Sequence, residues 1–83
     1  MNISIRIAAA VNEARRDLHV DELHQNYMNI LDSMSDYLDT AEHIQQWMQM
    51  EKDAKAAYDT AVFEAYCVGK RLECALIGAM DPN

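Results

Sequence analysis

Apolar residues recur along residues 41–79 at alternating steps of three and four positions. The members of this stripe are Ile44, Trp47, Ala54, Tyr58, Ala61, Ala65, Val68, Leu72, Ala75 and Ala79. Such steps keep side chains on one side of a helix, and an average of 3.5 is the coiled-coil period. Only Glu51 interrupts the series, and no proline lies within it. The pattern therefore predicts a long helix over residues 41–79, against which the rest of the chain packs.

Two shorter amphipathic segments precede this stripe. The first carries Ile3, Ile7, Val11, Ala14 and Leu18, and the second carries Leu23, Tyr27, Ile30, Met34 and Tyr37. We expect helices over residues 4–18 and 21–38. The phase of the pattern breaks between them, which predicts a turn near residues 19–21 with Asp21 as N-cap. A kinked continuous helix is also compatible, because neither glycine nor proline enforces a stop there. Asp39 or Thr40 is expected to cap the third helix.

These three helices predict an all-α fold in one domain, residues 1–83. It is a small three-helix bundle or a helical hairpin with a long C-terminal helix. At about 1.5 Å per residue the third helix is roughly 58 Å long, far longer than either partner. Either it breaks near residues 50–53, or the first two helices cover it in series, or a second copy covers the remainder. We favour the second copy.

A second apolar row in the third helix supports that choice. It consists of Phe63, Tyr66, Cys67, Cys74 and Ile77, well away from the main stripe. A helix with two apolar faces is buried on both. We therefore expect residues 63–77 to mediate self-association, with a homodimer as the result.

Acidic residues give the chain its second distinctive property, a net charge of −7. Between residues 21 and 64 there are ten acids and two lysines. We assign a partner-binding acidic face to Asp32, Asp36, Asp39, Glu42, Asp53 and Asp59. Such a face either solvates the protein or attracts a basic groove, for example on a nucleic-acid-handling protein. Direct binding to nucleic acid is disfavoured by the same charge.

The aromatic and thioether side chains around Trp47 admit two interpretations. Trp47 lies on the main stripe, which favours the core. Trp47, Met48 and Met50 would alternatively form a binding hot spot, because tryptophan is enriched at such positions and methionine adapts to varied partners.

No catalytic, metal or nucleotide motif is present, so we expect no enzyme activity, no metal and no cofactor. His19 and His24 are five residues apart and do not share a helix face. Cys67 and Cys74 are too distant on one helix for a disulfide, since about 10.5 Å separates their Cα atoms. We expect a cytoplasmic protein, because the thiols are expected to be reduced and no signal-peptide pattern is present. We expect no membrane span, because there is no long apolar run.

Together these features suggest a small acidic protein-interaction module without catalysis. It would act as a regulatory inhibitor or adaptor that binds a protein partner, as phage and other mobile-element accessory proteins do. The alternative is a structural homo-oligomerisation module with no separate ligand site. The sequence contains no motif that indicates a known family.

Overall fold

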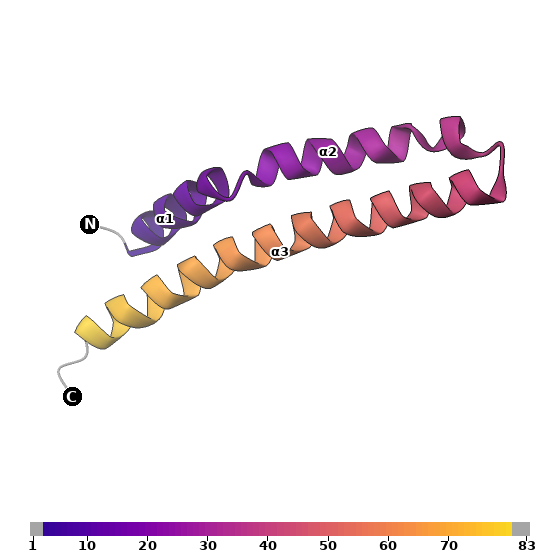
Figure 1. The fold of residues 1–83 in the computed structure, drawn as a ribbon. Helices are drawn as coiled ribbons and strands as arrows, with labels where there is room; N and C mark the ends of the chain where they lie inside the picture. The colour runs from indigo at the N-terminus through magenta and orange to yellow at the C-terminus, as the bar shows by residue number, and fades with distance from the viewer. Residues whose placement is uncertain (1–2, 81–83) are drawn as a thin grey trace.

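The computed structural model describes residues 3–80, with side chains up to residue 78, and every element within them is helical. The elements are α1 (Ile3–Asp17), α2 (Val20–Asp32), a 3₁₀ turn (Met34–Tyr37) and α3 (Ala41–Met80). They form a helical hairpin in which α1 and α2 run along one side of α3 (Figure 1). The predicted all-α class is confirmed, in its hairpin form.

The mismatch in helix length is resolved within one chain. α1 packs on the C-terminal half of α3 and α2 on the N-terminal half, end to end (Figure 1). The favoured explanation, in which a second copy was needed to cover this side of the third helix, is therefore wrong. The result is a rod of 64 × 20 × 14 Å with a radius of gyration of 18.6 Å. A compact chain of this length would have a radius of about 12 Å.

Leu18 and His19 join α1 to α2, and His19 has a left-handed conformation. His19 has φ 57° and ψ 39°, and its amide donates to the carbonyl of Arg16 (3.1 Å). A turn is thus present where the phase of the pattern broke. Its predicted cap is wrong, however, because α2 begins at Val20 and His19 occupies the N-cap position without a side-chain cap. Asp21 instead lies in the first turn, where a carboxylate favours the helix dipole.

α2 ends six residues earlier than the predicted limit of residue 38. Ser33 stops it, because its hydroxyl donates to the carbonyl of Ile30 (2.7 Å) and its amide is shared between Asn29 and Ile30. Serine hydroxyls compete in this way with the helical backbone pattern. The 3₁₀ turn follows, and it carries the chain around to α3.

α3 is continuous for 40 residues, so a break near residues 50–53 does not occur. Thr40 caps it, because its hydroxyl accepts a hydrogen bond from the amide of His43 (3.1 Å). Glu51, which interrupted the apolar stripe, faces α2 and accepts a hydrogen bond from the Tyr27 hydroxyl (3.0 Å). The carboxylate therefore meets a polar partner across the hairpin.

Small side chains on the inner face of α3 let α1 and α2 approach it closely. Ala54, Ala61 and Ala65 are buried along the inner face of α3, as is Gly69. A Cβ placed on Gly69 would lie 2.5 Å from Cγ2 of Val11, so glycine is what permits this approach. Few side chains are fully buried, because each helix touches its neighbours on one side only.

Candidate functional site

An open apolar groove lies at the hairpin tip, where the 3₁₀ turn meets the start of α3. It has a volume of about 320 Å³. The side chains that line it are Met34, Tyr37, Leu38, Ile44, Trp47 and Met48. Leu38 is 56% exposed and Met48 is 57% exposed. Exposed large apolar side chains gathered around a hollow are typical of a binding surface.

Trp47 lines this tip groove and connects α3 to α2. Its indole Nε1 donates to the carbonyl of Ile30 in the last turn of α2 (2.7 Å). The ring is half-buried, so it is both a packing residue and part of the groove wall. Met48 shares the groove, but Met50 does not line it and is half-buried. The structure thus brings together two of the three predicted hot-spot residues.

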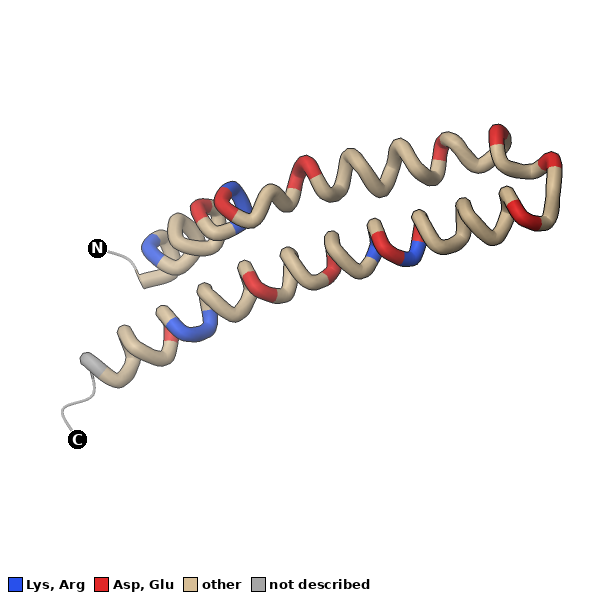
Figure 2. The backbone as a smooth tube through the Cα atoms, in the orientation of Figure 1, with Lys and Arg blue, Asp and Glu red and all other residues tan. Residues whose placement is uncertain are grey.

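Acidic side chains border the tip groove. Asp36 belongs to the 3₁₀ turn that forms one wall, Asp32 ends α2, and Asp39 and Glu42 flank the start of α3. Figure 2 shows acidic positions around the turn that joins the two sides of the hairpin. All four are exposed. No lysine or arginine occurs between Arg16 and Lys52, so this end of the rod has no formal positive side-chain charge to balance them.

Asp39 is held in place by hydrogen bonds. Its Oδ1 accepts from the amide of Thr40 (3.0 Å) and lies 2.7 Å from Nδ1 of His43. The hydrogen bond with His43 lowers the pKa of the Asp39 carboxyl below its ordinary value. The carboxylate at the base of α3 thus stays charged to lower pH than a free aspartate.

Two of the six predicted acidic residues lie away from the tip. Asp53 and Asp59 follow Glu42 along α3 by about 16 and 26 Å, at 1.5 Å per residue. Lys52 directly precedes Asp53 in the sequence, and Lys55 lies between Asp53 and Asp59. Asp53 also accepts a hydrogen bond from Gln49 (2.8 Å). The six residues therefore do not form one continuous face.

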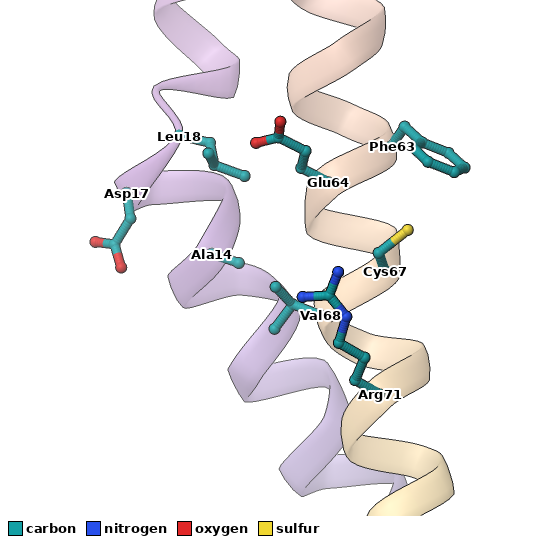
Figure 3. Close-up of a pocket in the computed structure, with 8 residues that line it drawn as sticks. All are labelled: Ala14, Asp17, Leu18, Phe63, Glu64, Cys67, Val68 and Arg71. Carbon is teal, nitrogen blue, oxygen red and sulfur yellow. The ribbon is translucent and has the colours of Figure 1, made fainter.

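A second exposed apolar surface, here called the outer row, lies on the C-terminal half of α3. It contains the residues predicted for self-association: Phe63, Tyr66, Cys67, Cys74 and Ile77. Phe63 is 64% exposed and Ile77 is 55% exposed. Figure 3 shows the Phe63 ring pointing away from α1, with the Cys67 sulfur on the same side of α3. Both cysteines are free thiols.

A groove of about 430 Å³ lies between α1 and α3, and Phe63 and Cys67 of the outer row take part in its lining. Glu64, Cys67, Val68 and Arg71 line its α3 side (Figure 3). Neither Glu64 nor Arg71 has a hydrogen-bond or ion-pair partner among the described residues. These two charges are therefore available to a neighbouring molecule.

The described part of the chain shows no other chemical centre. Across residues 3–78, no group of three or more histidine, cysteine or acidic side chains is placed to hold a metal ion. His19 instead lies 3.3 Å from Glu22. Within the described range, no helix has both the length and the apolar character needed to cross a membrane.

The tip groove was not predicted as a unit. The periodicity predicts Met34 and Tyr37 on a regular helix, whereas in the structure they belong to the 3₁₀ turn and line the groove together with residues of α3. The signal that could have found it is Leu38, an apolar residue beside the predicted turn that widens the stripe of the second helix.

Comparison of the chain with protein-family models, with curated proteins and with solved structures gave no match.

Proposed function

We propose that this chain is a non-catalytic protein-interaction module whose hairpin tip binds a basic segment of another protein. The observation that carries this proposal is the apolar tip groove bordered by Asp32, Asp36, Asp39 and Glu42 in a stretch without lysine or arginine. An apolar anchor would fill the groove, and the flanking lysines or arginines of that partner would face the acids. Charge of this kind raises the association rate, and the groove supplies specificity.

A basic partner surface is often one that handles nucleic acid, because phosphate recognition requires lysine and arginine. Occupying such a surface makes the chain an inhibitor, whereas joining it to a second protein makes it an adaptor. These are the regulatory roles expected for a phage or mobile-element accessory protein. The two free thiols are compatible with a reducing compartment, so we place this activity in the cytoplasm.

The test is capture of partners from host lysate with tip variants. Asp36→Asn with Glu42→Gln removes two tip charges, neither of which makes a side-chain hydrogen bond in the described structure. Glu13→Gln with Asp17→Asn makes the same chemical change on α1. We expect the tip variant to lose a salt-sensitive basic partner and the α1 variant to keep it. Equal binding by both would refute a role for the tip charges.

The contribution of the apolar tip groove to partner binding is tested with a separate variant. Leu38→Ser removes an exposed side chain of the tip groove, and Ile5→Ser removes one that is 64% exposed at the other end of the rod. The protein has a single tryptophan, which lies in the groove, so its fluorescence reports occupancy directly. A captured partner that leaves this fluorescence unchanged binds elsewhere.

We propose self-association through the outer row as a second activity. The chain exposes 6286 Å², whereas a compact monomer of this mass exposes about 5,000 Å². The difference of about 1,200 Å² exceeds the roughly 800 Å² that each partner contributes to a standard interface. Phe63, Tyr66 and Ile77 of the outer row are exposed large apolar side chains on the C-terminal half of α3, so this row is the surface for the homodimer.

Replacement of both Phe63 and Ile77 by glutamate tests this second activity. We expect the variant to sediment as a monomer and to keep its helical circular dichroism, since both side chains point to solvent in one chain. Ile5→Glu with Met48→Glu is the matched control, because it introduces the same charges at other exposed apolar sites. A wild-type protein that is monomeric at all concentrations would refute self-association.

A further inference from the structure

The outer row continues through Lys70 as a seven-residue repeat. Phe63, Cys67, Lys70, Cys74 and Ile77 follow at steps of four, three, four and three, the spacing of a coiled-coil seam. This side of α3 is opposite the side that packs on α1, about half a turn away on the helix. We propose that a second copy covers this seam with the two α3 helices antiparallel, related by a two-fold axis between residues 68 and 69. The proposal rests on the self-association proposed above and specifies its geometry.

The register follows from the charges beside the seam. Glu64 and Arg71 flank it on one side, and Tyr66 and Glu73 flank it on the other. A two-fold axis places the same flank of both copies on the same side. In this register Glu64 and Arg71 of the second copy differ by two residues in height, which is about 3 Å. The pair repeats by symmetry, so the dimer gains two Glu64–Arg71 salt bridges across the interface.

Other registers place like charges together. A shift of one heptad in one direction sets Arg71 against Arg71 of the second copy, and a shift in the other sets Glu64 against Glu64. A parallel pair sets Lys70 against its own copy in the seam and brings Glu64 beside Asp59 of the second copy. Like charges at these positions oppose association. The antiparallel register with its axis between residues 68 and 69 avoids all of these contacts between like charges. It also pairs Glu64 with Arg71 of the second copy.

Lys70 is compatible with a place in the seam. Its Nζ lies 3.2 Å from Oε2 of Glu73 and 5.8 Å from the centre of the Tyr66 ring. The charge is thus drawn to one flank while the aliphatic stem remains over the seam. A single polar residue within an apolar seam favours one register and one oligomeric state over the alternatives.

The test is sedimentation equilibrium of charge-reversed variants. Glu64→Arg and Arg71→Glu should each weaken dimerisation about tenfold, because each turns two attractive pairs into two repulsive ones. The double variant should return to within about threefold of the wild type, since it reverses both partners. Glu13→Arg and Arg6→Glu on α1 are matched controls with the same spacing and the same change of net charge. We expect them to leave the dimer unchanged.

The outcomes separate the geometry from the self-association on which it rests. Tighter association of Glu64→Arg would indicate the parallel pair, in which this change removes a repulsion from Asp59, and would overturn the proposal. A wild-type dimer that is insensitive to both reversals would also overturn the register while leaving self-association intact. A wild type that never dimerises would overturn both. Circular dichroism of each variant verifies that the monomer remains helical.

Discussion

Gly69→Ala should destabilise the hairpin although it improves the helix. Alanine in the interior of a helix is favoured over glycine by about 1 kcal/mol. The added methyl group, however, would lie 2.5 Å from Cγ2 of Val11, where a β-branched side chain has little freedom to move. Overpacking of this kind costs about 1–3 kcal/mol. We therefore expect a net loss of about 0–2 kcal/mol in the free energy of unfolding.

Gly78→Ala is the matched substitution in the same helix. No atom lies within 4 Å of a Cβ at that position, so only the helical preference of alanine remains. The variant should be more stable than the wild type by up to about 1 kcal/mol, less any fraying near the helix end. Urea unfolding followed by circular dichroism measures both changes, and an unchanged m-value ensures that they are changes in stability.

A double-mutant cycle with Val11→Ala isolates the steric contact. In that background the clashing methyl group is absent, so Gly69→Ala should become stabilising by up to about 1 kcal/mol. This reversal of sign is the specific expectation. The reasoning is refuted if Gly69→Ala stabilises the otherwise unaltered protein as much as Gly78→Ala does, since α1 would then not approach α3 as closely as the structure shows.

Three further predictions concern the turns and the cross-hairpin hydrogen bond. Thr40→Ala should lower stability by about 1 kcal/mol through loss of the α3 cap, whereas Thr40→Ser should restore most of it; equal unfolding midpoints would contradict the cap. His19→Gly should be more stable than His19→Ala by about 1 kcal/mol, because the left-handed joint strains any residue with a Cβ, and the opposite order would argue for a regular helix there. The hydrogen bond to Glu51 raises the pKa of Tyr27 in the folded protein above its ordinary value of 10.0. This hydrogen bond therefore stabilises the fold fully below pH 10.0, and its contribution is lost as the pH rises through the raised pKa of the folded state. Phenolate absorbance should show this delayed titration in the wild type and lose it in Glu51→Gln.

The sequence was sufficient to predict the three helices because each has a long, regular apolar stripe. It could not place the end of α2, since the stripe continues through Met34 and Tyr37 after the backbone has left the α-helix. The stop depends on the Ser33 hydroxyl, a local competition that periodicity does not record. Asp21 was assigned as N-cap by residue preference, yet the cap position falls on a left-handed His19.

The sites were predictable to different extents. The outer row could be predicted because it lies on the opposite side of the helix from the main stripe, and the structure leaves Phe63 and Ile77 exposed. The tip groove could not be predicted, because its walls come from residues on both sides of a turn and the sequence does not determine the geometry of that turn. Glu51 appeared as a defect in the stripe, and its partner Tyr27 lies 24 positions earlier in the chain. A pattern read along one helix does not reveal a hydrogen bond across two.

The left-handed joint at His19 also divides the hairpin into two parts of unequal strength. α1 contains no fully buried side chain, whereas Val20, just beyond the joint, is 1% exposed. The tip half is tied further by the bonds from Tyr27 to Glu51 and from Trp47 to Ile30. We therefore expect α1 to detach before α2, and its amides to exchange with solvent faster than those of α2. In that state α1 would be released from the C-terminal half of α3 while the hairpin tip remains assembled.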